Sequence, residues 1–234
     1  MDCKICSSTS QYFKSMQLLN KYTVKYYICD NCGFLQTEEP FWLDEAYNTP
    51  ITKNDVGLLH RNISVSKLYN DMISTFFDKT KDFIDYGGGY GIFVRLMRDL
   101  GINFYWYDLH VKNLFAYGYD ADISGKIQYE VLTAIEVFEH LKDPLKDIEK
   151  MLKLSPNILL DTLLIPEDLT VEDEWWYYGL DHGQHISFFS LKTLEYIANK
   201  YNLLLYSNGE TTYLLTSKKI SNFNEMFKKE EEEV

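Results

Sequence analysis

Short apolar runs alternate with amphipathic stretches along most of this 234-residue chain. Apolar runs of strand length lie at 83–86, 104–107, 129–136 and 157–164. Helical spacing of apolar residues occurs at 62–78, 92–100, 145–154 and 191–201. Two final apolar runs, 203–206 and 211–216, flank Asn208-Gly209, which is typical of a hairpin turn. The alternation predicts an α/β fold with a doubly wound, mostly parallel sheet and a C-terminal antiparallel hairpin.

The four cysteines all lie near the start of the chain, as Cys3-x-x-Cys6 and Cys29-x-x-Cys32. The N-terminus lacks the apolar stretch of a signal peptide, so we expect a reducing compartment, where such pairs bind metal instead of forming disulfides. Four thiolates fill the tetrahedral shell of Zn²⁺, which indicates a structural ion. The sequence therefore predicts a small zinc ribbon, with reduced cysteines that bind nothing as the alternative.

Changes in composition divide the chain into four parts. We expect the zinc-ribbon module over residues 1–40 and a connector rich in loop-forming residues over 41–61. The main α/β domain should occupy 62–220. Residues 221–234 end in a run of four glutamates followed by a valine, and we expect them to form an acidic, frayed tail.

A glycine-rich turn follows the first apolar run of the main domain, in the order Asp85-Tyr86-Gly87-Gly88-Gly89-Tyr90-Gly91. Glycines let the backbone approach a ligand closely, and the free N–H groups of the following helix face it. A dinucleotide-binding turn would have the spacing G-x-G-x-x-G, whereas this turn has D-x-G-x-G-x-G. The pattern predicts a nucleotide-type cofactor other than NAD, with an empty tight turn as the alternative.

Three acidic residues follow predicted strands, namely Asp85, Asp108 and Glu136. In open α/β sheets the ligand lies beyond the carboxyl ends of the strands, so these side chains should lie near it. Asp108 comes 23 positions after Asp85, close to the ~20 expected for a carboxylate that binds ribose hydroxyls. Both oxygens of a carboxylate accept hydrogen bonds, which suits a vicinal diol.

Longer stretches make the chain resemble a zinc-ribbon-bearing subgroup of class I S-adenosylmethionine (SAM)-dependent methyltransferases. Many members of this subgroup modify sugars in bacterial surface-polysaccharide or antibiotic pathways. The matching stretches are 29–34, 85–91, 107–108, 136–144 (EVFEHLKDP) and 183–190 (GQHISFFS). Together they span nearly the whole chain, and they imply a Rossmann-like fold with SAM as cofactor.

The resemblance implies a cofactor-binding role for five residues. Asp85, Gly87 and Gly89 would contact the methionine part of SAM. Asp108 would hold the ribose, and Glu136 would lie along the edge of the cofactor.

The resemblance also implies that His140 and His185 face the acceptor. We expect His185 to be the catalytic base, because a histidine keeps a neutral fraction near pH 7 and the surrounding loop is polar. For His140, an ordinary surface-loop position is the alternative. Some sugar C-methyltransferases of this kind have Glu where this chain has Gln184, which favours oxygen as the acceptor atom here.

Further acceptor contacts are expected from the aromatic cluster 174–178 and from the connector. Trp176 and Tyr178 are candidates for a lid whose rings stack on a sugar, with a core anchor for the loop as the alternative. Arg61 is the natural clamp if the acceptor carries phosphate.

The formal net charge of −12 argues against a nucleic-acid partner, which needs clustered Lys and Arg. No apolar run approaches the ~20 residues that span a bilayer, so we expect a cytoplasmic protein. The sequence predicts a SAM-dependent methyltransferase for a small sugar-derived, nucleotide- or phosphate-linked acceptor. Alternatives are an RNA methyltransferase that uses the ribbon to bind substrate and a non-catalytic partner protein.

Overall fold

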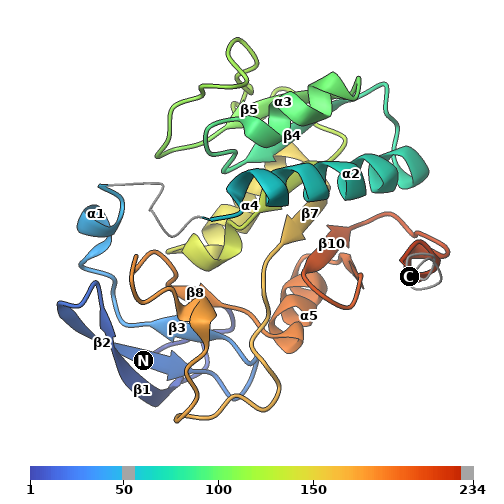
Figure 1. The fold of residues 1–234 in the computed structure, drawn as a ribbon. Helices are drawn as coiled ribbons and strands as arrows, with labels where there is room; N and C mark the ends of the chain where they lie inside the picture. Colours follow the sequence, from blue (N-terminus) through green and yellow to red (C-terminus); the bar gives the residue numbers. More distant parts are fainter. Residues whose placement is uncertain (49–55, 228–234) are drawn as a thin grey trace, which may run out of the picture.

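The computed structural model describes residues 1–48 and 56–227. Its main part is a six-stranded sheet in the order β5-β4-β6-β7-β10-β9 (Figure 1). The strands are β4 (Asp82–Tyr86), β5 (Asn103–Tyr107), β6 (Leu132–Ile135), β7 (Asn157–Asp161), β9 (Leu204–Ser207) and β10 (Thr212–Thr216). The first four are parallel, and β10 runs antiparallel to both of its neighbours. The predicted fold class, including the closing hairpin, is confirmed.

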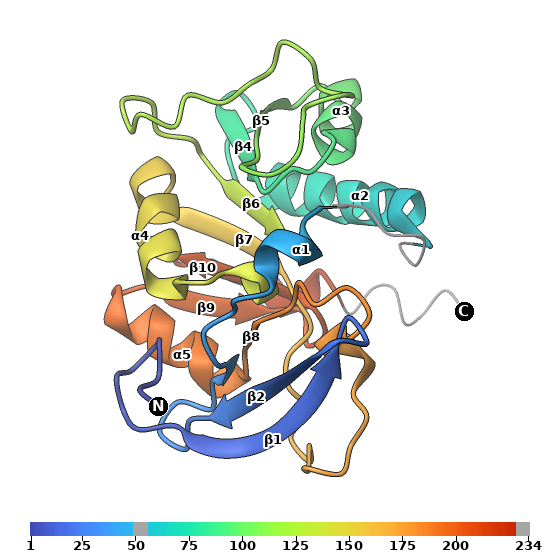
Figure 2. The same ribbon diagram turned by 90° about the vertical axis from the view of Figure 1, so that its left-hand side faces the viewer.

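Helices cover both faces of this sheet (Figure 2). On one face lie α2 (Leu58–Phe76) and α3 (Ile92–Asp99), and on the other lie α4 (Pro144–Leu154) and α5 (Leu191–Lys200). Each pair buries its apolar stripe against the strands, so the sheet separates two hydrophobic clusters. Burial on both faces explains why the strands read as continuous apolar runs.

The strand order reverses between β4 and β6. From β4 the chain passes through α3 to β5 on one side, and from β6 through α4 to β7 on the other. The loops at the carboxyl ends of β4 and β6 therefore diverge and leave a crevice, which is where open α/β sheets bind their ligands.

A second sheet contains the N-terminal module, in the order β1-β2-β3-β8. Its strands are β1 (Gln11–Leu18), β2 (Tyr22–Ile28), β3 (Leu35–Thr37) and β8 (Ser187–Phe188). The first three come from the residues expected to form the module, but β8 comes from the main part of the chain. Leu35 pairs with Phe188 and Gln36 with Ser187. The module is thus joined to the main part by a shared sheet.

The connector and the tail are more ordered than loop-like composition predicts. Residues 41–61 include the short helix α1 (Leu43–Ala46) and the first turn of α2, while 49–55 lie outside the described residues. In the tail, Phe223 is 2% exposed and stacks on Phe76 with ring centroids 5.5 Å apart. The described part of the tail is therefore packed, whereas residues 228–234 lie outside the described residues.

Among the helices that the structure describes, none combines the length and the apolar character needed to cross a membrane.

Candidate functional site

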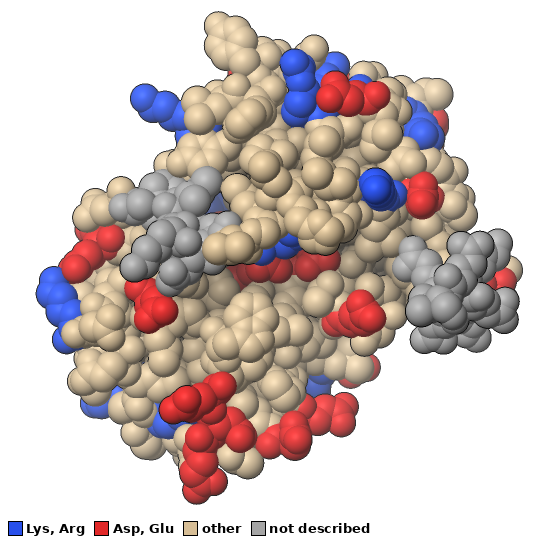
Figure 3. Space-filling model, in the orientation of Figure 1, with Lys and Arg blue, Asp and Glu red and all other residues tan. Residues whose placement is uncertain are grey.

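A cleft of about 1880 Å³ opens between the carboxyl ends of the parallel strands and the N-terminal module. Figure 3 shows a hollow in the surface between the main part of the chain and the N-terminal module. Asp and Glu residues lie in this hollow. Apart from the cysteines, every site residue expected from the sequence lines this cleft. They are Arg61, Asp85, Gly87, Gly89, Asp108, Glu136, His140, Trp176, Tyr178, Gln184 and His185.

The glycine turn forms one wall of the cleft. The N–H groups of Gly87 and Gly88 donate to the carbonyl of Tyr107, at 2.8 and 3.0 Å. Gly87 has a φ of +76°, and a Cβ there would lie 2.6 Å from a methyl carbon of Val137. Gly89 has a φ of +53°, and a Cβ there would meet nothing within 4 Å. Gly89 therefore lies against open space that a ligand can fill.

Asp108 follows β5 and is fixed by backbone donors. Its Oδ2 accepts from the N–H of Gly89 at 2.9 Å, and its Oδ1 accepts from the N–H groups of His110 and Val111 at 2.7 and 3.0 Å. These three bonds leave acceptor capacity on a group that has roughly four lone-pair positions. The carboxylate is held at the edge of the glycine turn with room for a further donor.

Asp85 lies beneath the glycine turn and is 3% exposed. Burial raises the pKa of this carboxyl group to about 7. The nearby Asp108 also raises this pKa, whereas a 2.7 Å hydrogen bond from Thr133 Oγ1 lowers it. A Cβ on Gly88 would lie 2.8 Å from Asp85 Oδ2. Asp85 therefore supports the turn from below.

Glu136 directly follows β6 and has a left-handed backbone conformation with a φ of +52°. A non-glycine residue rarely adopts this conformation, and such strain gathers at functional sites. Burial raises the pKa of Glu136 to about 7, while the nearby Arg61 lowers it and Asp161 raises it. The strained residue therefore directs a titratable carboxyl group into the cleft.

His185 lies opposite the glycine turn and is 8% exposed. Its Nδ1 is 2.6 Å from the carbonyl oxygen of Tyr177. Because a carbonyl only accepts, Nδ1 carries the hydrogen, and the neutral ring has its lone pair at Nε2. Burial holds the pKa of His185 well below its usual range, and His140 lowers it further. The ring is therefore a neutral proton acceptor.

His140 belongs to the short helix η1 (Phe138–His140) and lies against His185, with ring centroids 4.9 Å apart. Its Nδ1 is 3.2 Å from both the hydroxyl of Tyr47 and the carbonyl oxygen of Gln184. His182 packs against the other side of His185 at 4.7 Å. The two histidines expected from the sequence are thus brought together, with a third beside them.

Glu139 is a buried residue beside the site to which the sequence analysis gave no role. It is fully buried, and its carboxyl group accepts from the hydroxyl groups of Tyr177 at 2.7 Å and Thr162 at 3.1 Å. One of its oxygens and a nitrogen from each of His140 and His185 lie within 4.8 Å of one another. The spacing of Glu139 three residues after Glu136 was the available signal, but the buried partners come from distant segments.

The two aromatic residues expected to contact the acceptor differ in their surroundings. Trp176, in η2 (Trp176–Tyr178), is 76% exposed and lines the mouth of the cleft. Tyr178 is 1% exposed and packs edge-on against Tyr26 and Phe188, with centroids 5.5 Å away. Trp176 therefore has a surface to offer a ligand, whereas the ring of Tyr178 mainly anchors the loop.

Gln184 and Arg61 also have partners of their own. The side-chain amide of Gln184 donates to the carbonyl of Ala46 at 2.9 Å and so ties the loop to α1. Arg61 is exposed on α2 and lowers the pKa values of both Glu136 and Asp161. Its charge is therefore partly offset by these two carboxyl groups, of which Glu136 lines the cleft.

The lining of the cleft is acidic on the module side. The acidic side chains there are Asp44, Glu172, Asp173, Glu174 and Asp181. Lys14 and Lys142 also line it, but Lys142 pairs with Glu39 and Lys14 Nζ donates to the backbone of Asp173. The balance of charge disfavours an anionic ligand on this side.

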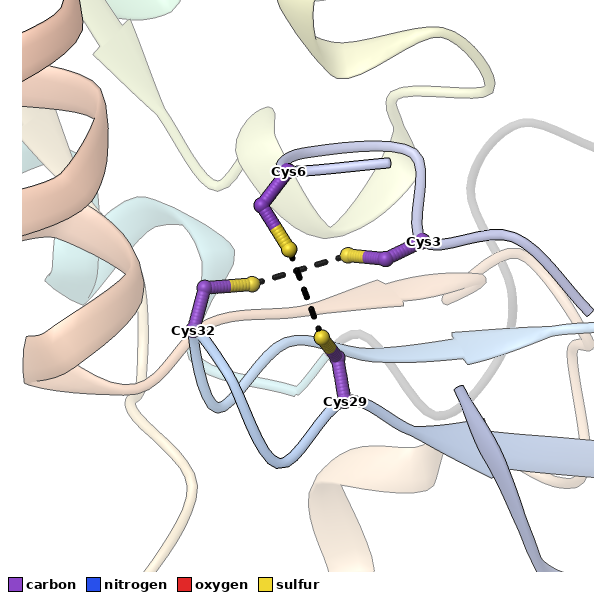
Figure 4. Close-up of side chains that lie close together, drawn as sticks. All are labelled: Cys3, Cys6, Cys29 and Cys32. Atoms are coloured by element: carbon purple, nitrogen blue, oxygen red, sulfur yellow. Dashed lines mark hydrogen bonds between the residues drawn. The ribbon is translucent and has the colours of Figure 1, made fainter. Parts of the chain in front are cut away.

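The four cysteines point toward one another from two turns (Figure 4). The Sγ atoms of Cys3 and Cys32 are 3.5 Å apart, those of Cys6 and Cys29 are 3.4 Å apart, and all four lie within 4.8 Å of one another. In a tetrahedral zinc site with Zn–S distances of ~2.3 Å, the sulfur atoms are about 3.8 Å apart. The donor set and its dimensions therefore fit a structural zinc ion.

Comparisons with known proteins address the main part of the chain. One solved structure that the chain resembles is an O-methyltransferase family protein from Burkholderia thailandensis, with 12% sequence identity and a TM-score of 0.45. The aligned part covers 71% of this chain and 62% of that protein. A second is the magnesium protoporphyrin IX methyltransferase from Synechocystis PCC 6803, with S-adenosylhomocysteine (SAH) bound, at 14% identity and a TM-score of 0.46, covering 75% and 94%. No curated protein matches the sequence.

A family model supplies the assignment. Residues 60–208 match the model described as a methyltransferase domain. This stretch is well over half of the 234 residues and contains both the glycine turn and the His185 loop. The chain therefore belongs to this methyltransferase family.

Proposed function

We propose that the enzyme transfers a methyl group from SAM to an oxygen atom of a small sugar-derived acceptor. The observation that carries the proposal is the single cleft shared by the glycine turn and His185. One wall offers a backbone cradle beside a fixed carboxylate. The other offers a neutral imidazole with its lone pair at Nε2.

The cradle supports SAM as the cofactor. Gly89 adjoins open space where a Cβ would meet nothing, and Asp108 keeps capacity for a further donor. In the proposed assignment Asp85, Gly87 and Gly89 hold the methionine part, and Asp108 holds the ribose. Glu136 lies along the edge of the cofactor. When bound, SAM supplies an electrophilic methyl group on a positively charged sulfur.

The chain's own residues supply the remaining chemistry on the acceptor side. His185 Nε2 accepts the proton of the acceptor hydroxyl, and the Tyr177 carbonyl keeps the ring in the required tautomer. Burial holds the ring neutral near pH 7 and so keeps its base form available. His140 lies next to this ring and helps to position the acceptor.

The charge of the cleft limits the class of acceptor that we propose. A nucleotide- or phosphate-linked sugar needs cations, and Arg61 is the candidate, but Glu136 and Asp161 lie close to it. The acidic side chains on the module side oppose a phosphate further. Within the sugar-derived class we therefore propose an acceptor with little negative charge, with Trp176 as the exposed ring on which it packs.

We also propose that the four cysteines hold a structural zinc ion and that the protein works in the cytoplasm, where thiols stay reduced. Metal analysis should find about one zinc per chain. A fully folded protein that contains no metal would contradict this part of the proposal.

Titration calorimetry with SAH tests the donor side. Asp108→Ala should weaken SAH binding at least about tenfold, which corresponds to roughly 1.4 kcal/mol. Asp99→Ala, an exposed change of the same kind at the end of α3, is the matched control and should bind as the unmodified protein does. If folded protein gives no binding heat with SAH, the proposal is wrong.

Product detection by mass spectrometry tests the acceptor side. Neutral sugars, sugar phosphates and nucleoside diphosphate sugars should be offered in parallel with SAM. We expect methylated product only with the neutral class. His185→Ala should lower turnover far more than SAH affinity, and equal loss of both would contradict its role as the base.

A further inference from the structure

The turn that carries Cys29 and Cys32 contacts the start of α5. The carbonyl of Cys32 accepts from Thr193 Oγ1 at 2.8 Å and from Ser190 Oγ at 3.4 Å. Lys192 Nζ donates to the carbonyl of Asp30 at 2.9 Å. Figure 4 shows Cys32 beside this helix. The second cysteine turn is therefore bonded to the main part of the chain through its backbone.

The close fit of this turn continues through Gly33. A Cβ on Gly33 would lie 2.3 Å from Ser190 Oγ. The next residue, Phe34, packs against Phe189 with ring centroids 5.1 Å apart, and Phe189 packs against Phe138. The chain therefore leaves the cysteine turn in direct contact with the residues that follow β8.

The pairing of β3 with β8 extends this contact to the residue next to His185. The N–H of Thr37 donates to the carbonyl of Ile186 at 3.1 Å, and the N–H of Ile186 donates to the carbonyl of Glu139 at 2.9 Å. Ile186 is thus held between the module and η1. His185 directly precedes it, and its Nδ1 is held by the Tyr177 carbonyl.

A second connection reaches the same loop from the other side. The indole N–H of Trp42 donates to the carbonyl of Gly183 at 2.7 Å, and the amide of Gln184 donates to the carbonyl of Ala46. Backbone and side-chain bonds from residues 32–46 thus reach positions 183, 184 and 186. The N-terminal module and the connector together therefore hold the loop that carries His185.

The cofactor wall is held differently. The N–H groups of Gly87 and Gly88 bond to Tyr107, Gly89 bonds to Asp108, and the indole of Trp106 donates to the carbonyl of Gly89 at 2.8 Å. These partners belong to β5 and the residue after it. The glycine turn is therefore held by the six-stranded sheet.

We propose that metal binding by the four cysteines positions His185, through the contacts of Cys32 with α5 and of β3 with β8, and leaves the glycine turn unaffected. Small modules of this kind fold on metal, so we expect the ion to add to the hydrogen bonds of Gln36 with Asp2 and Lys4 in holding the two cysteine turns together. Thr193 is then a positioning residue for His185. This inference rests on the proposed metal site and on the proposed base.

Amide hydrogen exchange on the full chain tests the inference, with protein carrying one zinc per chain compared with protein stripped by a chelator under reducing conditions. We expect removal of zinc to speed exchange at Ile186, Phe188 and Leu194 at least about tenfold, while Gly87 and Gly88 change less than about threefold. Equal acceleration at both walls, global unfolding, or unchanged exchange at Ile186 would each overturn the inference.

A pair of substitutions tests the same connection with the metal in place. Thr193→Val removes the hydroxyl that donates to Cys32, whereas Thr193→Ser keeps it. We expect faster exchange at Ile186 in the valine variant only, with one zinc per chain in both. Identical exchange in the two variants would overturn the role of Thr193.

Ring nitrogen NMR of His185 reads the positioning directly. In zinc-loaded protein we expect the single tautomer with hydrogen on Nδ1, and in stripped protein a mixture of tautomers. An unchanged His185 spectrum after zinc removal would overturn the inference. None of these measurements uses cofactor or acceptor, so a failure of SAH to bind contradicts the proposed function alone.

Discussion

The buried carboxyl group of Asp85 makes the free energy of unfolding depend on pH. Its pKa is about 7 in the folded protein, against an ordinary value of 3.8, chiefly because of burial. Folding therefore takes up a proton at this group. The stability that it contributes is fully present below pH 4 and is lost as the pH rises toward 7.

The size of the effect follows from the two pKa values. Each pH unit between the unfolded and folded pKa is worth about 1.4 kcal/mol. Between pH 5 and pH 8 the group therefore removes roughly 2–3 kcal/mol from the free energy of unfolding. Little of this is screened by solvent, because Asp85 is 3% exposed. Such a change is a substantial part of the ~5–15 kcal/mol typical of a folded domain.

The Asp85→Asn variant removes the titration and keeps an oxygen that accepts from Thr133. Urea unfolding followed by tryptophan fluorescence at pH 5 and pH 8 measures the effect. From pH 5 to pH 8, we expect the free energy of unfolding to fall by about 2–3 kcal/mol less in the variant than in the unmodified protein. The variant should be the more stable of the two at pH 8. Some pH dependence remains, because burial also raises the pKa values of Glu136 and Asp161.

The control is Asp71→Asn, an exposed change on α2 that alters the net charge equally. Its pH dependence should match that of the unmodified protein. If Asp85→Asn also matches the unmodified protein, the reasoning from burial to a raised pKa is refuted.

Further predictions separate packing from binding. Gly89→Ala should lower the free energy of unfolding by about 1–2 kcal/mol, because residue 89 has a left-handed backbone. It should also abolish SAH binding in calorimetry, because the new methyl group enters open space in the cleft. Gly87→Ala should lower the free energy of unfolding, measured in urea, by more than Gly89→Ala does, since its Cβ would lie 2.6 Å from Val137. A smaller decrease than in Gly89→Ala would contradict this geometry. Phe223→Ala should destabilise the protein by about 3 kcal/mol, whereas a frayed tail would show no loss.

Local sequence signals predicted the strand, turn and helix that form the glycine-turn wall of the cleft. The apolar run before the glycines became β4, and the helix after them begins at Ile92 as expected. A strand, a turn and a helix that follow one another depend on short-range rules, such as the freedom of glycine to adopt a positive φ. The cysteine spacing was equally informative, because two pairs of thiols define a tetrahedral cluster without knowledge of the rest of the fold.

The wall of the cleft that carries His185 depends on contacts between distant segments, and the sequence predicted its structure less well. Strand β8 has two residues, and only its partner β3 makes it a strand. The burial of Glu139 depends on Tyr177 and Thr162, and that of Tyr178 depends on Tyr26 and Phe188. A buried aromatic anchor and an exposed stacking ring have the same sequence pattern, and only the fold distinguishes them.

The pairing of β3 with β8 also sets an order of events during synthesis of the chain. Leu35 pairs with Phe188, so the partner of an early strand is made more than 150 residues later. At ~5–20 residues per second, this interval is roughly 8–30 s. The cysteines thus leave the ribosome well before the segments that bury them. The proposed zinc ion can bind the cysteines during that interval, so we expect zinc supply at translation to govern the yield of folded protein.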